Sequence, residues 1–125
     1  MDKTHLLLAE DDVMLASLLK FRLEKAGYRV DLAADGRQVK ELVDRQMPDI
    51  IVSDIMMPYC SGIELVDYLR NELGSQVPVI IISTAGSESN VLSAFEMGAD
   101  DFISKPVSPS ELLVRLSKLL RVPKT

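Results

Sequence analysis

The chain has 125 residues and a formal net charge of −5, with 14 Lys and Arg against 19 Asp and Glu. That length is typical of one domain, and the 47% apolar content is enough for a packed core, which excludes a disordered chain. The acidic balance argues against a nucleic-acid surface, which would need a basic patch. No apolar run approaches the ~20 residues of a membrane span, and the single cysteine, Cys60, suits a reducing cytoplasm.

Short apolar runs alternate along the chain with amphipathic segments. The runs are too short for helices and predict strands, and the polar–apolar alternation in 28–32 is typical of an edge strand. In chain order, the prediction is a strand at 6–9, a helix over 15–26, a strand at 28–32, a helix around 39–43, a strand at 50–52, a helix over 65–73, a strand at 79–82, a helix around 91–95, a strand at 101–104 and a helix over 112–120.

Capping residues mark several of the predicted helix ends. Ser61 and Glu64 form a capping box, and Ser108 followed by Pro109 and Glu111 is a strong start signal for the last helix. The second helix is expected to open at Asp35. Three helices are expected to stop at a glycine, namely at Gly27, Gly74 and Gly98.

The order of elements is a βα unit repeated five times, which predicts an α/β fold with a parallel sheet covered by helices on both faces. Three buried strands and two edge strands fit the doubly wound order 2-1-3-4-5 of flavodoxin-like domains. Residues 1–121 are expected to form this one domain, and residues 122–125 a tail or the start of a linker.

In such a sheet, ligands bind beyond the carboxyl ends of the strands. Glu10 and Asp11 follow the first predicted strand, Asp54 the third, Thr84 the fourth and Lys105 the fifth. These strand ends are neighbours in the proposed order. We therefore expect the three carboxylates, the hydroxyl and the ammonium group to meet at one place.

This combination of groups favours phosphoryl chemistry. Two carboxylates ~4 Å apart repel by about 4 kcal/mol at an effective dielectric of 20, so the cluster needs a proton or a cation. Oxygen-only ligands favour Mg2+, held by Asp11, Asp54 and a backbone carbonyl just after Asp54. Lys105 and Thr84 suit phosphoryl oxygens, which makes Asp54 a plausible nucleophile that forms an aspartyl phosphate.

Five segments in this order resemble the receiver domain of two-component response regulators. They are Leu8-Ala9-Glu10-Asp11-Asp12, Asp54-Ile55-Met56-Met57-Pro58 with Gly62, Ser83-Thr84-Ala85, Gly98-Ala99-Asp100-Asp101-Phe102, and Lys105-Pro106. Each segment alone is a weak signal, but together they cover the chain from Leu6 to about Leu120.

The resemblance implies a role for each matching residue. Asp54 would accept a phosphoryl group from a histidine kinase or a phosphotransfer protein, and the domain would be a phosphoacceptor with its own phosphorylation and dephosphorylation chemistry rather than an enzyme. The other implied roles are Mg2+ binding by Asp11, Asp54, the Met56 backbone carbonyl and, through water, Glu10; phosphate binding by Lys105; switching by Thr84 and Phe102; and a cis bond before Pro106.

The resemblance also implies how the signal would leave the domain. Thr84 would move to the phosphoryl oxygen, Phe102 would rotate into the space left behind, and the face made by the fourth helix, fifth strand and fifth helix would change. Phe102 lacks the hydroxyl of the Tyr common at this position, so packing alone would drive its rotation. Glu111 and Arg115 resemble residues of regulators that dimerise through this face.

Two alternatives from other classes remain at this stage. One is a receiver-like scaffold that binds partners without phosphorylation. The other is a flavin- or nucleotide-binding module on the same fold, although Glu10 and Asp11 stand where a glycine-rich phosphate loop would be needed. The cognate kinase and the output domain stay open.

Overall fold

The computed structural model describes residues 3–84 and 88–121. The predicted tail at 122–125, and Ala85 of the third motif, lie outside the described residues. The elements are β1 (His5–Ala9), α1 (Val13–Lys25), β2 (Arg29–Ala33), α2 (Gly36–Arg45), β3 (Ile50–Asp54), α3 (Gly62–Asp67), a π-helical turn η1 (Tyr68–Glu72), β4 (Val79–Ser83), α4 (Glu88–Met97), β5 (Asp101–Ser104) and α5 (Pro109–Arg121).

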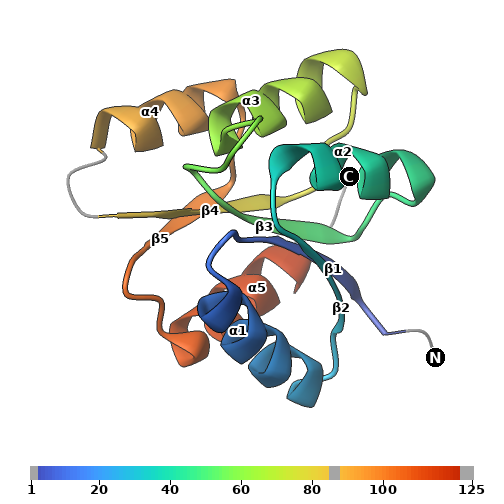
Figure 1. Ribbon diagram of the computed structural model, residues 1–125, viewed down its shortest axis with the longest axis vertical. Coiled ribbons are helices and arrows are strands. Elements are labelled where there is room, and N and C mark those ends of the chain that lie inside the picture. Colours follow the sequence, from blue (N-terminus) through green and yellow to red (C-terminus); the bar gives the residue numbers. More distant parts are fainter. Residues whose placement is uncertain (1–2, 85–87, 122–125) are drawn as a thin grey trace.

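The five strands form one parallel sheet in the order β2-β1-β3-β4-β5, which confirms the predicted doubly wound topology. Helices α1 and α5 cover one face, and α2, α3 and α4 cover the other (Figure 1). Among the described residues, none of the helices combines the length and the apolar character that a membrane span requires.

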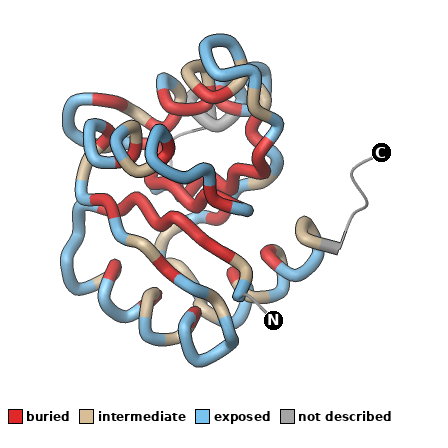
Figure 2. Tube along the Cα trace, turned by 90° about the vertical axis from the view of Figure 1, so that its right-hand side faces the viewer, coloured by how far each residue is buried: buried red, intermediate tan, exposed pale blue. Residues whose placement is uncertain are grey.

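The sheet separates two apolar cores, and alternate side chains of each central strand enter opposite ones. In β1, Leu6 and Leu8 pack toward α1 and α5, whereas Leu7 and Ala9 pack toward α2 and α3. The central strands are therefore buried on both faces, as Figure 2 shows. Each buried leucine contributes roughly 1.5–3 kcal/mol, which holds the strand ends at the site in a fixed frame.

Side-chain caps begin the helices where the sequence predicts them. The Asp35 carboxylate accepts hydrogen bonds from the backbone N–H groups of Arg37 and Gln38 at the start of α2. Ser61 Oγ accepts one from the Glu64 N–H at the start of α3. Caps of this kind satisfy N–H groups that have no partner within the helix.

The third helix differs from the prediction of one helix running to Gly74. The α-helix ends at Asp67 and continues as η1, in which the Leu73 N–H donates to the Tyr68 carbonyl five residues back, at 3.0 Å. The apolar spacing of the sequence records which residues face the core. It does not record whether each turn closes over four or five residues, so the pattern could not reveal the π-helical turn.

Arg70, within η1, ties this turn to the end of α4. Its guanidinium donates to the Gly98 carbonyl at 2.9 Å and to the Ser75 carbonyl at 3.0 Å, and lies 3.2 Å from the Asp100 carboxylate. The side chain is only 9% exposed, and burial lowers its pKa although Asp100 opposes this. Arg70 therefore satisfies the Gly98 carbonyl at the carboxyl end of α4, where the helix has no donors of its own, and the Ser75 carbonyl between η1 and β4.

Replacing Arg70 by methionine should lower the free energy of unfolding by about 2–3 kcal/mol, because hydrogen bonds from a charged donor are lost while their half-buried acceptors remain. Urea unfolding of the two proteins measures this difference. Glu72→Gln, an exposed change in the same turn, is the matched control and should leave stability within about 0.5 kcal/mol. Equal stability of Arg70→Met and wild type would contradict the assigned role.

Candidate functional site

The carboxyl ends of three strands bring the main candidate residues together. Glu10 and Asp11 directly follow β1, Asp54 is the last residue of β3, and Lys105 directly follows β5. Because β1 and β3 are neighbours and only β4 separates β3 from β5, the side chains converge above the middle of the sheet. The predicted convergence is therefore a property of the topology.

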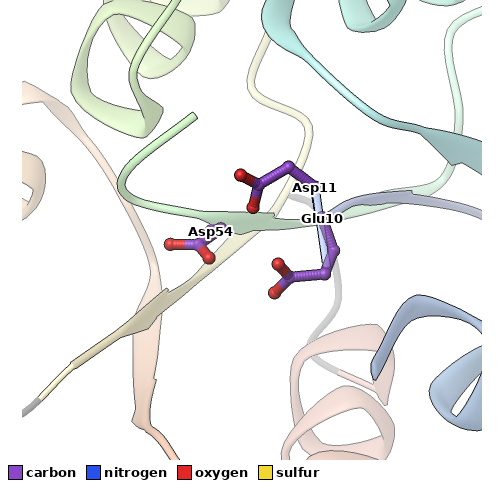
Figure 3. A group of neighbouring side chains, drawn as sticks. All are labelled: Glu10, Asp11 and Asp54. Carbon is purple, nitrogen blue, oxygen red and sulfur yellow. The ribbon is translucent and has the colours of Figure 1, made fainter. Parts of the chain in front are cut away.

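The three carboxylates form a tight cluster. Glu10, Asp11 and Asp54 each offer an oxygen atom within 4.8 Å of the other two (Figure 3). Glu10 and Asp54 are buried, whereas Asp11 is exposed. Like charges at this spacing repel each other strongly when water is excluded. The cluster therefore requires positive charge.

Lys105 supplies one positive charge to this cluster. Its ammonium nitrogen lies 2.7 Å from Asp54 Oδ2 and 3.4 Å from Glu10 Oε1. Burial by itself would lower the lysine pKa, but the hydrogen bond and charge of Asp54, together with Glu10, outweigh it and raise the pKa. Lys105 therefore stays charged and holds the Asp54 carboxylate in one orientation.

The pKa of Glu10 reflects the remaining negative charge of the cluster. Burial, followed by the repulsion of Asp54, raises its pKa to about 7, although the Asp12 N–H and Lys105 act in the opposite direction. Its Oε2 accepts the Asp12 N–H at 3.0 Å. Its Oε1 is buried and has no hydrogen-bond partner among the described residues. That oxygen is suited to a water molecule carried by a cation.

The donor set fits a hard divalent cation. All side-chain ligands are carboxylate oxygens, and no histidine or cysteine belongs to the cluster. Oxygen ligands of this kind, few in number and open to solvent on one side through Asp11, suit Mg2+, which keeps several of its waters. Glu10 Oε1 is paired with the Lys105 ammonium at 3.4 Å but accepts no hydrogen bond among the described residues, so it can also accept one from a water of a hydrated ion.

The acidic triplet divides into two functions that the sequence could not separate. Asp12 turns away from the cluster and caps α1, because its carboxylate accepts hydrogen bonds from the Met14 and Leu15 N–H groups at 3.1 and 3.2 Å. Glu10 and Asp11 alone face Asp54. Acidic residues also favour a helix start, and in this triplet that role belongs to Asp12 only.

The loop after β3 packs closely over the acceptor. The Met56 N–H donates to Asp54 Oδ1 at 3.0 Å, so both carboxylate oxygens of Asp54 are engaged. Gly62 lies so close to this loop that a Cβ there would come within 2.9 Å of Ile55 Cα and 3.0 Å of the Asp54 carbonyl. Glycine is therefore required where α3 starts against the strand end.

The remaining predicted residues lie along β4 and β5. Thr84 directly follows β4 and is exposed. Phe102, in β5, is 37% exposed and packs edge-on against Phe95 of α4, with ring centroids 5.8 Å apart. The Lys105–Pro106 peptide bond is cis. Phe102 does not belong to the acidic cluster but lies on the face formed by α4 and β5.

Two residues beside the site carry no sequence signal that singled them out. Tyr59 adopts a left-handed backbone conformation with φ of 70°, and the Arg37 guanidinium lies 3.7 Å from the centre of its ring. A bulky residue is rarely found in this conformation. The sequence Pro58-Tyr59-Cys60 therefore gave no reason to expect a left-handed conformation at Tyr59.

The fold and the site together define a flavodoxin-like domain with an acidic, lysine-bearing pocket at its carboxyl edge. The family model described as the response regulator receiver domain matches residues 6–117 of the sequence. The chain therefore belongs to the receiver domains of two-component response regulators, as its motifs suggested.

Individual relatives agree with this family. The transcriptional regulatory protein CpxR of Escherichia coli is 40% identical over 116 residues, which are 93% of this chain and 49% of that protein. The phosphate regulon transcriptional regulatory protein PhoB of Pseudomonas aeruginosa is 38% identical over 117 residues, 93% of this chain and 51% of that protein. This chain thus spans about half the length of either regulator.

A solved receiver domain has the same fold. The receiver domain of the Francisella response regulator 1452 superposes with a TM-score of 0.87 at 36% identity, covering 94% of this chain and 97% of that one. The correspondence therefore holds along nearly the whole length of both chains.

Mg2+ should raise the melting temperature of the wild-type chain, because a ligand that binds only the folded state stabilises it. Asp11→Asn should remove most of this gain and, without Mg2+, should itself be neutral or stabilising because one repelling charge is gone. Asp12→Asn is the matched control, since asparagine caps a helix as well as aspartate. A full Mg2+ effect in Asp11→Asn would contradict the assignment of the cation site.

Proposed function

We propose that the chain accepts a phosphoryl group on Asp54 in a Mg2+-dependent reaction and passes the signal on through the face formed by α4, β5 and α5. The observation that carries this proposal is the 2.7 Å contact of Lys105 with Asp54 inside the three-carboxylate cluster. A carboxylate oriented by an ammonium group, with room for a divalent cation beside it, is suited to nucleophilic phosphoryl transfer.

In the proposed reaction an Asp54 oxygen forms a bond to the phosphorus of a phosphohistidine. The P–N bond breaks, the imidazole nitrogen keeps the electron pair and takes up a proton, and an acyl phosphate remains on Asp54. Lys105, already beside Asp54 Oδ2, neutralises phosphoryl oxygens as charge develops on them. The hydrogen bond from the Met56 N–H to Oδ1 keeps the carboxylate from rotating.

Asp11, Asp54 and the Met56 backbone carbonyl are the proposed cation ligands, and Glu10 would act through a bound water. The cation, when bound, would offset negative charge on the transferred group. Glu10 is suited to the indirect role because its Oε1 is buried and without a hydrogen-bond partner among the described residues. Its other oxygen is already held by the Asp12 N–H.

Thr84 and Phe102 are the proposed switch residues. The Thr84 hydroxyl would donate to a phosphoryl oxygen, and Phe102 would then leave its edge-on contact with Phe95 and turn inward. The phosphoryl group can shift this equilibrium only by the difference in its interactions with the two states. A ring that is 37% exposed gains apolar burial by turning inward, so packing can drive the swing without a phenol hydroxyl.

The same face could join two copies of the chain. Exposed apolar side chains, Leu92 on α4 and Val114 on α5, lie on its helices. Arg115 bonds to Asp101 at 2.8 Å and to Glu111 at 3.1 Å within one chain. A homodimer through this face would therefore use apolar contacts, unless Arg115 exchanges these carboxylates for those of the second copy.

The donor that we propose is a histidine kinase or a phosphotransfer protein. Any protein donor must cover the rim of the site to reach Asp54, and this rim carries exposed apolar side chains. Val13 and Met14 begin α1 directly after the acidic triplet, and Met56 follows Asp54; their exposed fractions are 76%, 84% and 63%. Such side chains are better buried against a partner than left in water.

The wider role is proposed from the relatives. PhoB and CpxR are transcriptional regulators about twice as long as this chain, so we propose that it works as the receiver portion of a cytoplasmic signalling system. The chain itself, at −5 net charge, would not bind nucleic acid directly. We also propose that it turns over no separate substrate: its own carboxylate accepts the phosphoryl group from kinase or small-molecule donors and later loses it to water.

Neither alternative function is favoured. A nucleotide-binding module would need a phosphate-cradling loop after β1, where Glu10 and Asp11 instead present negative charge. A scaffold independent of phosphorylation would not need Lys105 against Asp54, yet that contact is present. The phosphoacceptor role uses all of these residues.

Acetyl phosphate with Mg2+ should add a single phosphoryl group to the wild-type chain, seen by intact-protein mass spectrometry, and Asp54→Asn should abolish the addition because an amide is a poor nucleophile. Chelating Mg2+ should have the same effect, and Asp12→Asn should label normally. Undiminished phosphoryl incorporation in Asp54→Asn would disprove the acceptor assignment.

A further inference from the structure

The loop between β3 and α3, residues 55–61, rests on the first turn of α2. The Gly36 N–H donates to the Pro58 carbonyl at 3.3 Å. Gly36 also lies so close to Cys60 that a Cβ at position 36 would overlap the cysteine side chain. The start of α2 and the loop are therefore in direct contact, and any change in one must be accommodated by the other.

Tyr59, in the middle of this loop, has a conformation that its own backbone does not favour. Its φ of 70° is left-handed, which costs a residue with a large side chain roughly 1–2 kcal/mol. Such a conformation persists only where surrounding contacts impose it. The side chain is 69% exposed, so core burial does not impose it.

Hydrogen bonds from the Cys60 N–H at 2.8 Å and the Gly36 N–H at 3.3 Å to the Pro58 carbonyl help to impose this conformation. A further contact comes from Arg37, the second residue of α2. Its guanidinium carbon lies 3.7 Å from the centre of the Tyr59 ring, the spacing of a stacked cation–π pair. Arg37 also follows Gly36, which contacts Pro58 and Cys60 of the loop. Two successive residues of α2 thus contact the loop at Pro58, Tyr59 and Cys60.

The same loop also contacts Asp54, the proposed phosphoacceptor. Met56 lies three residues before Tyr59, and its N–H donates to Asp54 Oδ1 at 3.0 Å. At its far end the loop is fixed by the Gly62 N–H, which donates to the Ile55 carbonyl at 2.9 Å. A displacement of Tyr59 would therefore be passed to Met56 over a short, closed segment.

We propose that the stack of Arg37 on Tyr59 is a positioning contact that holds the β3–α3 loop where Met56 can serve the cation site. The inference rests on the proposed function, in which the Met56 carbonyl is a ligand of Mg2+. Arg37 and Tyr59 are positioning residues, because they act through Met56. When the stack is lost, the loop spends less time in the binding conformation, and the apparent affinity for Mg2+ falls by that fraction.

The sign of the effect separates this role from simple electrostatics. Arg37 carries a positive charge at the same edge of the sheet as the acidic cluster. Removing that charge should strengthen the binding of a cation if charge alone mattered. The positioning role predicts the opposite, a weaker binding, because the loop is released.

A similar contact farther along α2 provides the control. The Lys40 ammonium lies 4.9 Å from the centre of the Tyr68 ring, and the Tyr68 hydroxyl donates to Asp44 at 3.0 Å. These residues fasten α2 to η1. The Lys40 charge also acts on Cys60 of the loop, so the uncharged Tyr68 side of the contact is the cleaner control. Breaking this contact removes the same kind of interaction from the same helix without releasing Met56.

The test is the dissociation constant of Mg2+ for the full chain, measured by titration calorimetry and by the shift of the Met56 amide in NMR spectra. Tyr59→Leu removes the ring without changing charge and should weaken Mg2+ binding about two- to fivefold. Arg37→Gln should weaken it to a similar degree despite the lost positive charge. Tyr59→Phe, which keeps the ring, should match wild type, as should Lys40→Gln and Tyr68→Leu.

The double variant Arg37→Gln with Tyr59→Leu should bind Mg2+ no more weakly than Tyr59→Leu alone, because one contact is being removed twice. Unchanged binding by Tyr59→Leu, or tighter binding by Arg37→Gln, would overturn the inference while the proposed function stands. A wild-type chain that binds no Mg2+ would instead overturn the proposed function, and this inference with it.

Discussion

The contact between the Lys105 ammonium and the Asp54 carboxylate is the interaction on which the rest of the site depends. Three carboxylates meet within 4.8 Å, and the 2.7 Å ion pair neutralises only one of them. The surplus charge is held in place by the fold rather than relieved by it. It shows in Glu10, whose pKa is raised to about 7 by burial and by its neighbours. A pocket with this excess of negative charge favours the binding of a divalent cation.

The doubly wound topology is what keeps this unfavourable charge in place. Strands β1 and β3 are neighbours, and only β4 lies between β3 and β5, so groups distant in sequence converge without any special local structure. The two apolar cores on either face hold the strand ends. The apolar cores therefore stabilise the folded state, whereas the like charges buried at the carboxyl edge of the sheet destabilise it.

The sequence was enough for the fold and for the convergence of the three carboxylates with Lys105, because local patterns place the elements and the parallel topology then gathers the strand ends. Apolar runs such as 79–82 and caps such as Ser61 and Ser108 place the elements, and the sheet order then brings Asp54 and Lys105 together. Features that depend on packing between elements could not be predicted. The contact of Arg70 with Gly98 and the stack of Arg37 on Tyr59 each join residues distant in sequence. The π-helical turn at Tyr68–Glu72 was missed for another reason, because apolar spacing does not show whether a turn closes over four or five residues.

The most direct test of the account is a crystal structure of the chain with Mg2+ and beryllofluoride, a mimic of the acyl phosphate. The account predicts beryllium bonded to an Asp54 oxygen, the Lys105 ammonium and Thr84 hydroxyl on its fluorides, and Mg2+ held by Asp11 and Asp54. Beryllofluoride bound away from Asp54, or Mg2+ held without Asp11 and Asp54, would contradict the claim that this charged pocket is the phosphoacceptor site.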